Sequence, residues 1–157
     1  MKKEELAYIA GFLDGDGCIM LQLVFRHDYL LGYQIRASIV FYQSKQNAFF
    51  LGWVKKKLKD GYLRQRNDGM VEYTIIGIKP VTRILRLLKP YLRLKQKQAK
   101  IALKVLSLMP GSGRQMKPKL LYNLAKEVDK FAYLNYSKKR TNTSLKLKEF
   151  LLSKQLL

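Results

Sequence analysis

Hydrophobic residues along this chain follow two spacings, and each spacing predicts one kind of element. Between Ile19 and Arg26, and again between Tyr33 and Gln43, apolar and polar residues alternate one by one, which is the period of a strand with one buried face. Elsewhere apolar residues recur every three or four positions, as on one face of a helix. The helices expected from that spacing are Glu4 to Leu13, Lys45 to Leu58, Pro80 to Leu88, Lys95 to Met109, one that starts at Pro118, and one that starts near Ser144.

Glycines and polar turns separate these elements. Residues 27–32 connect the first two strands, and Asn67, Asp68 and Gly69 connect a second, shorter pair. That second pair covers Tyr62 to Arg66 and Val71 to Ile76, while Gly15 with Gly17 ends the first helix and Gly61 ends the second. The order helix, hairpin, helix, hairpin, helices predicts a single α+β domain over residues 1–157, with an antiparallel sheet.

The charge of the chain indicates a negative partner. There are 31 Lys and Arg against 11 Asp and Glu, a formal charge of +20, and 48% hydrophobic residues supply a packed core rather than a disordered basic tail. Nucleic acid is the first candidate, because neutralising phosphates releases counterions. No uncharged stretch exceeds 9 residues, so no membrane partner is expected. Cys18 is the only cysteine, which excludes an intrachain disulfide and favours an intracellular, reducing compartment.

Two acidic residues lie where a negative charge is unfavourable. Asp14 and Asp16 follow the first helix, where the macrodipole is negative, so a cation should compensate them. Carboxylates at such a place suggest ligands for a hard metal ion, although composition alone slightly favours a simple turn into the first strand. In addition, Ala7, Gly11 and Gly15 recur every four residues and would let another backbone approach one face of the helix.

The string from Ile9 to Gly17, IAGFLDGDG, resembles the motif of the LAGLIDADG homing endonucleases. The resemblance extends over most of the chain and is to the small members with a single motif. It includes the hairpin with an alternating polar face, Gln43 at the end of its second strand, the strand with Arg64 and Arg66, and residues 91–98, YLRLKQKQ. The leading Leu of the motif is replaced here by Ile9, a conservative change.

This resemblance implies a function and a set of site residues. It implies a homodimeric, Mg²⁺-dependent DNA endonuclease, encoded in an organellar intron and acting in a mitochondrion or chloroplast. Asp16 is then the metal-binding acid, Gly15 contributes its backbone carbonyl, and Asp14 buttresses the helix end. Gln43 stands near the attacking water and Lys95 near the scissile phosphate. The motif helices pair in the dimer through Ala7, Ala10, Gly11, Asp14 and Gly15.

The polar face of the sheet is the expected DNA-binding saddle. A ten-residue strand spans about 30 Å, or roughly nine base pairs, so two copies would cover about twenty base pairs of a near-palindromic site. Arginine suits guanine, glutamine suits adenine, an acid can accept from cytosine, and valine can contact thymine methyl groups. The expected contacts are Gln22, Val24, Arg26, Gln34, Arg36, Ser38, Val40, Arg64, Arg66, Glu72 and Thr74, with Lys138, Lys139 and Arg140 as phosphate contacts or a solvated charge run.

Two other functions fit the basic surface. One is an RNA-binding splicing factor of the maturase kind, and the other is a basic protein bound to ribosomal RNA. A pure RNA binder has no need of Asp16, Gln43 and Lys95, so these residues favour cleavage of double-stranded DNA.

Overall fold

The computed structural model describes residues 1–111, 113–135 and 140–157. Its contacts divide the chain into two compact units. The first unit contains residues 1–20 and 37–100, and the second contains residues 21–36 and 101–157. Strands β1 (Gly17–Phe25) and β2 (Tyr33–Ser44) each begin in one unit and end in the other.

The first helix is longer than the sequence predicted. Helix α1 (Lys3–Asp16) continues through Asp14 and Gly15 and ends where Gly17 adopts an extended conformation. Its apolar face, with Ile9, Ala10 and Leu13, is fully buried. The predicted last residue, Leu13, was about a turn too early, whereas Gly17, one of the two glycines predicted to end the helix, is its C-cap. The extra turn is held by contacts with a distant segment, described below.

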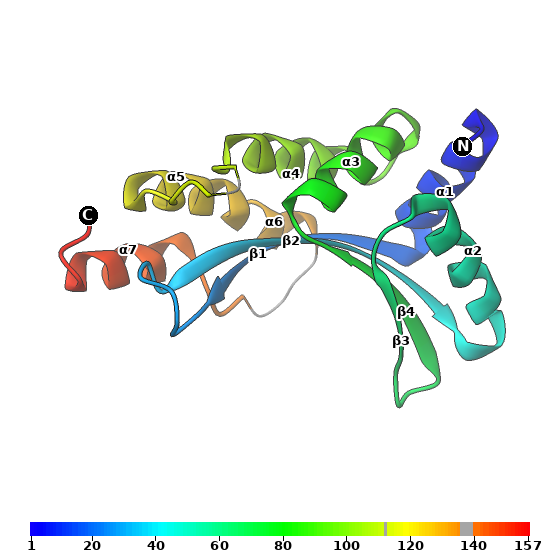
Figure 1. Ribbon diagram of the computed structural model, residues 1–157, viewed down its shortest axis with the longest axis horizontal. Helices are drawn as coiled ribbons and strands as arrows, with labels where there is room; N and C mark the ends of the chain where they lie inside the picture. Colours follow the sequence, from blue (N-terminus) through cyan, green and yellow to red (C-terminus); the bar gives the residue numbers. More distant parts are fainter. Residues whose placement is uncertain (112, 136–139) are drawn as a thin grey trace. The chain divides into compact units, whose positions relative to one another are not determined.

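The four strands form one sheet in the order β1-β2-β4-β3, with β3 (Tyr62–Gln65) and β4 (Met70–Ile76). Strand β4 pairs antiparallel with both β2 and β3, so β2 and β4 are the central strands. The two hairpins predicted from alternating residues are both present, and the α+β class is confirmed. Figure 1 shows the β3–β4 hairpin and the neighbouring helices.

The helices of the first unit cover one face of its strands. After a short 3-10 turn, η1 (Lys45–Asn47), helix α2 (Ala48–Leu58) contacts β3 and β4, and α3 (Ile78–Leu88) contacts β4 and α1. A second 3-10 turn, η2 (Lys89–Tyr91), also packs on α1. The core between these layers contains the fully buried aromatic rings of Phe41 and Tyr73, which stack on one another.

The second unit joins the tip of the first hairpin to the C-terminal helices. These are the later part of α4 (Gln96–Leu108), α5 (Pro118–Asp129), α6 (Phe131–Leu134) and α7 (Ser144–Ser153). Helices α5 and α7 pack together, and the ring of Phe150 in α7 meets those of Phe25 and Tyr33 in the hairpin. Within the described ranges, no helix combines the length and apolarity needed to cross a bilayer.

Candidate functional site

The Asp14 carboxylate connects the end of α1 to a segment about eighty residues further along the chain. It accepts hydrogen bonds from the backbone N–H groups of Arg93 (2.5 Å), Leu94 (3.2 Å) and Lys95 (2.9 Å). Only 8% of Asp14 is exposed. Because α4 begins at Gln96, this carboxylate also lies at the N-terminal end of that helix, where a negative charge is favourable. Asp14 is thus a structural ligand of the backbone before α4.

Lys95 supplies the cation that the sequence called for at the end of α1. Its ammonium Nζ donates to the backbone carbonyl of Asp14 (2.5 Å). Carbonyls in the last turn of a helix have no partner within the helix, and a positive group there offsets the negative end of the macrodipole. The two contacts of Lys95, by its backbone and by its side chain, place its charge beside the motif.

Asp16 differs from Asp14 in its exposure and in its hydrogen bonds. It is the last residue of α1, it is exposed, and its carboxylate makes no hydrogen bond or ion pair with any residue that the structure describes. Gly15, directly before it, is exposed as well. An unpaired carboxylate and a helix-end carbonyl are both oxygen donors of the kind that Mg²⁺ takes.

A magnesium ion fits these donors as a shared site rather than as a closed protein cage. In the described ranges no group of three or more His, Cys, Asp and Glu side chains comes together. Magnesium is often held by one or two carboxylates together with phosphate oxygens of the substrate. Asp16 and the Gly15 carbonyl would be the contribution of this chain to such a site.

Gln43 is tied to the beginning of the next helix. Its Oε1 accepts from the backbone N–H of Ser44 (2.9 Å) and from Nδ2 of Asn47 (3.5 Å). Among the described residues, no hydrogen bond joins Gln43 to Asp16 or to Lys95. The structure therefore brings Asp14, Asp16 and Lys95 to one helix end. It uses the Gln43 side-chain oxygen in hydrogen bonds to Ser44 and Asn47, and the amide nitrogen of Gln43 makes no hydrogen bond with a described residue.

Cys18 and Tyr42 lie near this helix end, and the sequence analysis did not select them. Burial raises the pKa of the Cys18 thiol, and the nearby Lys95 ammonium lowers it in part. Burial also raises the pKa of the Tyr42 phenol, with Cys18 and Glu72 adding to the effect. The signal was present, because Tyr42 continues the alternating series of Ser38 and Val40 on the polar face of β2.

The predicted DNA-contacting residues of the first hairpin differ in exposure. Gln22, Arg26 and Arg36 are exposed, while Val24 and Gln34 are half-buried. Ser38 and Val40 are only 6% and 5% exposed, because β2 pairs there with β4 and becomes a central strand. In the chain as described, Ser38 and Val40 therefore offer little surface to a ligand.

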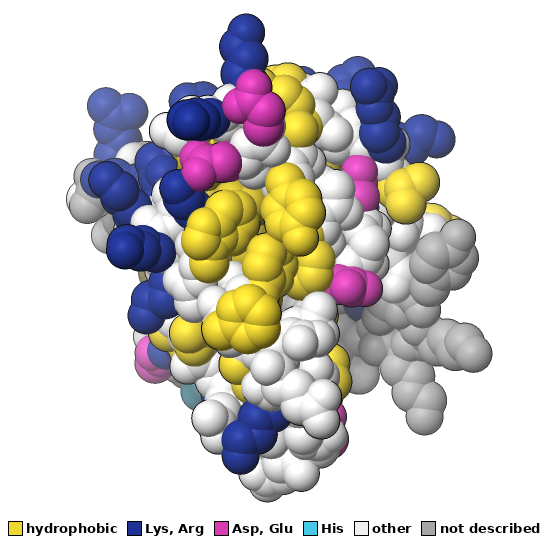
Figure 2. All heavy atoms as spheres, turned by 90° about the vertical axis from the view of Figure 1, so that its right-hand side faces the viewer, with side chains coloured by type: hydrophobic (Ala, Val, Ile, Leu, Met, Phe, Trp, Pro, Cys, Tyr) yellow, Lys and Arg dark blue, Asp and Glu magenta, His cyan; other side chains and the backbone are white. Residues whose placement is uncertain are grey.

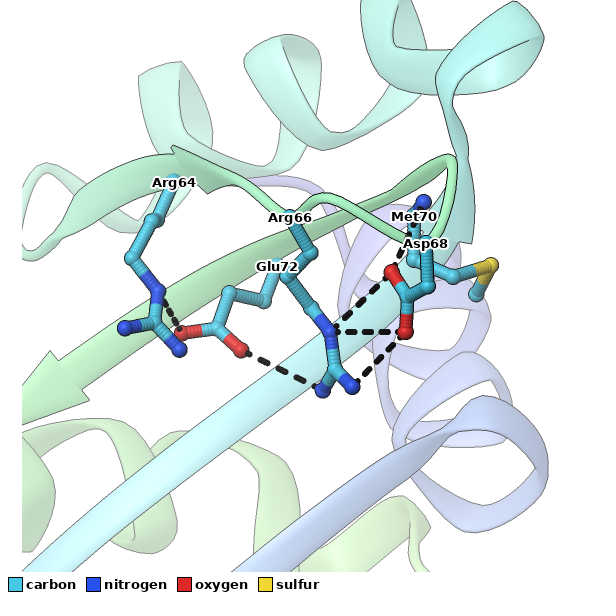
Figure 3. Close-up of polar contacts among 5 residues, drawn as sticks. All are labelled: Arg64, Arg66, Asp68, Met70 and Glu72. Atoms are coloured by element: carbon cyan, nitrogen blue, oxygen red, sulfur yellow. Dashed lines mark hydrogen bonds and ion pairs between the residues drawn. The ribbon is translucent and has the colours of Figure 1, made fainter.

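The second hairpin carries a network of two arginines and two acids (Figure 3). Glu72 lies opposite Arg64 on the neighbouring strand and pairs with its Nε at 2.8 Å, while Arg66 Nη1 lies 3.8 Å from the same carboxylate. Arg66 also pairs with Asp68 at 2.8 Å. Glu72 is 8% exposed, so the predicted cytosine acceptor is covered by the two predicted guanine readers. Thr74 is 6% exposed, and its hydroxyl has no partner among the described residues.

Arg140 has a structural role that the sequence did not predict. Its guanidinium donates to the carbonyl of Val128 and to that of Leu21 (2.8 Å), and it lies 3.9 Å from Asp129. Burial lowers the pKa of this guanidinium, and Asp129 raises it in part. These contacts occupy the side chain inside the second unit, which argues against the predicted phosphate contact. Lys138 and Lys139 lie outside the described residues.

The small-residue stripe of α1 is open, with one correction. Ala7, Gly11 and Gly15 are exposed, and a Cβ built on either glycine would meet nothing within 4 Å. Ala10 is fully buried and Asp14 nearly so, so these two face the core of their own chain and not the open side. The prediction that Ala10 and Asp14 help to pair the two motif helices was therefore wrong, because both lie on the buried side of the helix.

An aromatic patch lies on α1 and α2 (Figure 2). Tyr8 and Phe49 are 60% and 78% exposed. The ring of Tyr8 meets those of Phe50 and Trp53 edge to face. Large exposed apolar patches are unusual on proteins that act alone.

A strongly basic α+β chain, with a four-stranded antiparallel sheet and two acids at the end of its first helix, has the features of a nucleic-acid-binding protein with the donors of a metal site. The family model described as LAGLIDADG endonuclease matches residues 9–105. The chain therefore belongs to the LAGLIDADG endonuclease family, which confirms the family predicted from the sequence and, with it, a DNA-cleaving hydrolase.

Individual relatives are similar over almost the whole chain. The DNA endonuclease I-CvuI of Chlorella vulgaris is 40% identical over 147 residues, which are 94% of this chain and 89% of that protein. The DNA endonuclease I-CreI of Chlamydomonas reinhardtii is 36% identical over 142 residues, 90% of this chain and 85% of that protein. In the crystal structure of I-CvuI with its target and calcium, the matched chain has a TM-score of 0.92 and 38% identity, with 98% of this chain and 96% of that chain covered.

A second I-CvuI structure, with the I-CreI target and magnesium, has a TM-score of 0.93, with 38% identity, and the match covers 99% of this chain and 97% of that chain. Divalent cations thus accompany both I-CvuI complexes. The archaeal homing endonuclease I-Vdi141I, solved with DNA, shares the fold at a TM-score of 0.86 and 15% identity, with full coverage of both chains.

Proposed function

We propose that two copies of this chain form a homodimer that cuts both strands of a long, near-palindromic DNA site in the presence of Mg²⁺. The main observation behind this proposal is that the two acids at the end of α1 have different surroundings. Asp14 and Lys95 are joined by two hydrogen bonds, whereas Asp16 is exposed and makes no hydrogen bond or ion pair with the described residues. The identity of 36–40% to two DNA endonucleases supports the same activity.

Two copies are needed because one chain carries one Asp16. Cutting a duplex requires a cleavage centre for each strand, and a two-fold dimer supplies the second centre. The open face of α1, with Ala7, Gly11 and Gly15, is a self-complementary surface that would bring the two helix ends together. The aromatic patch around Tyr8 adjoins this face and supplies apolar area that association could bury.

Each residue of the site has a different role in the proposed hydrolysis. Asp16 and the Gly15 carbonyl would hold the magnesium ion, whose chemistry is to activate water and to neutralise charge on the leaving oxygen. Asp14 fixes the backbone before α4 and thereby the position of Lys95. The Lys95 ammonium provides positive charge for the scissile phosphate, and the free amide of Gln43 can orient a water or a phosphate oxygen.

On the sheet, the exposed predicted residues are the ones that can reach base edges. These are Gln22, Arg26, Arg36, Arg64 and Arg66, with Val24 and Gln34 half-exposed between them. Alternate residues of a strand point to the same side of that strand, so each hairpin offers its own set of side chains to the major groove.

The deciding experiment is cleavage of DNA by the purified protein. A duplex library with a randomised site of about twenty base pairs is incubated with the protein and Mg²⁺, and cleaved products are sequenced. We expect cutting by the wild type and none by Asp16→Asn, whose fold should be intact. Equal cutting by both proteins would refute the role of Asp16. Binding without cutting, with higher affinity for structured RNA, would indicate the splicing function instead.

We also propose that the protein acts in an organelle of its host. The support is the family resemblance, together with the origin of both similar endonucleases in green algae. Mapping the coding sequence to an organellar intron would test this, and a position in a nuclear gene without an organelle-directed product would contradict it.

A further inference from the structure

Both hairpins carry an arginine followed two residues later by an aspartate, and in both the two side chains form the same ion pair. Arg26 donates through Nε to Asp28 Oδ1 (2.9 Å) and through Nη2 to Oδ2 (2.7 Å). Arg66 donates through Nε (3.1 Å) and Nη2 (2.8 Å) to Asp68 Oδ2, as Figure 3 shows. Each pair lies within a single compact unit, so neither depends on how the two units are arranged.

Each aspartate occupies one edge of its guanidinium. The other edge of Arg66 is shared with Glu72, whose carboxylate lies 3.8 Å from Nη1. Arginine has five N–H donors, and each aspartate occupies the edge formed by Nε and Nη2. The opposite edge presents Nη1 and the second Nη2 hydrogen, which match the two acceptors N7 and O6 of guanine. Arg26 Nη1 makes no hydrogen bond to any described residue, so this edge is free in the first hairpin.

Stability does not explain why two of the 11 acids in this chain occupy these positions. The four side chains are between 42% and 62% exposed, and exposed ion pairs contribute little to folding. An acid beside DNA also repels phosphate, so each aspartate weakens unspecific binding. The pairs instead orient each arginine side chain. A free arginine loses rotamer freedom when it binds a base, and an arginine that an aspartate already holds loses less.

The turns themselves support this orientation. In the first hairpin the ring of Tyr29 lies 5.4 Å from Arg26 Cζ, and the backbone N–H of Arg26 donates to Gly32 (2.8 Å). In the second hairpin Asp68 Oδ1 also accepts from the backbone N–H of Met70 (3.2 Å). Arg36 on the same polar face is an internal comparison, since it is exposed and makes no ion pair with the described residues.

We propose that Asp28 and Asp68 are positioning residues that hold Arg26 and Arg66 by their Nε edges. Arg26 then presents its free opposite edge to guanine, and Arg66 presents the edge that Glu72 also contacts. This inference rests on the proposed DNA-binding function and adds the source of its base specificity. Asp28 and Asp68 lower the affinity for DNA of any sequence, and they raise the discrimination between bases at the position that their arginine contacts.

The test is a comparison of base preference among matched variants. The wild type first selects duplexes from the randomised library with Ca²⁺, and Arg26→Ala identifies the position at which Arg26 prefers guanine. We then expect Asp28→Ala to lower guanine discrimination at that position by about tenfold, since a good bidentate contact is worth about five- to 150-fold in discrimination. Its affinity for an unrelated duplex should rise. Asp68→Asn, which keeps an acceptor for Met70, should act likewise on Arg66.

Two controls separate positioning from charge. Glu149→Gln changes the net charge by the same amount at an exposed residue of α7, and it should leave base preference unchanged. In the Arg26→Ala background, Asp28→Ala should have no further effect on preference. Unchanged guanine preference in Asp28→Ala, with normal DNA binding, would overturn this inference alone, whereas failure of the wild type to select any duplex would overturn the proposed function as well.

The pair can also be measured in the free protein. The hydrogen bonds from Arg26 lower the pKa of Asp28 to about 2. In Arg26→Ala, the pKa of Asp28, measured by NMR of its carboxyl group, should return to the ordinary value of about 4. An Asp28 pKa that is already ordinary in the wild type would show that the pair does not form and would overturn the inference without DNA.

Discussion

Two carboxylates of the motif, only two residues apart, have opposite surroundings. Asp14 is nearly buried and accepts three backbone N–H groups, whereas Asp16 is exposed and has no partner among the described residues. A buried carboxylate with its hydrogen bonds made is part of the structure, and an exposed one at a helix end is available to a cation. The motif thus combines a structural acid with an acid that is open to a cation.

We predict that Asp14→Asn destabilises the fold while Asp16→Asn does not. An amide offers one acceptor oxygen where the carboxylate offers two, so at least one backbone N–H before α4 loses its partner. The expected cost is about 1–3 kcal/mol in the free energy of unfolding, measured by urea titration at fixed protein concentration. Asp16→Asn is the matched control and should stay within about 0.5 kcal/mol of the wild type. Equal stabilities for both variants would contradict the buried role of Asp14.

At the residue scale, the sequence predicted which side chains share a face better than which are accessible. Alternation placed Ser38, Val40, Glu72 and Thr74 on the polar face, and parity along the strands agrees with that. All four are buried nevertheless, because β2 and β4 are central strands and their neighbours cover them. Strand order depends on pairing between distant segments, which periodicity along one strand does not contain.

The sequence predicted the end of a helix or strand well where the residues next to that end determine it. The turn at Asn67, Asp68 and Gly69 is present, and Pro118 begins α5 as expected. The end of α1 was not predicted, because the groups that stabilise it are on residues 93–95, far away in the sequence. Local signals such as Gly15 cannot report a contact of that kind.

Gly32 is the glycine on which the packing of α7 depends. It has φ +64° in the turn of the first hairpin, and a Cβ there would lie 2.4 Å from the ring of Phe150. We predict that Gly32→Ala destabilises the protein clearly more than Gly69→Ala. Gly69 has φ +78° with open space around it, so this control carries the same backbone strain of about 1 kcal/mol without the clash. Thermal unfolding measures both, and equal losses would show that Phe150 moves away freely.

The open face of α1 gives a prediction that separates folding from association. Gly11→Ala places a methyl group in open space on an exposed helix, so the isolated chain should gain about 0.5–1 kcal/mol in stability. The same methyl group would separate two helices that pack through this face, so dimerisation should weaken. Gly52→Ala in α2, also in open space, should stabilise the chain without affecting the dimer. Sedimentation decides, and an unweakened Gly11→Ala dimer would exclude this face as the interface.

At the scale of the whole molecule, the two compact units share their strands. Both β1 and β2 continue from one unit into the other, whereas β3 and β4 lie wholly in the first unit. We therefore predict that residues 1–157 unfold as the single domain expected from the sequence. Circular dichroism and tryptophan fluorescence should give coincident urea transitions, since Trp53 reports on the first unit alone. Separate transitions would show that the units fold independently.

The charge of the whole molecule determines how DNA binding responds to salt. One chain carries +20, so two carry 2 × 20 = +40. If a dimer neutralises six to ten phosphates, affinity for the selected duplex should fall by about 10³–10⁵-fold between 50 and 200 mM salt. Fluorescence anisotropy at constant Ca²⁺ measures this dependence. In a parallel titration without divalent cations, Asp16→Asn should keep the wild-type slope, because it removes no Lys or Arg that meets a phosphate. An affinity that hardly changes with salt would mean that the basic residues are directed at something other than the DNA backbone.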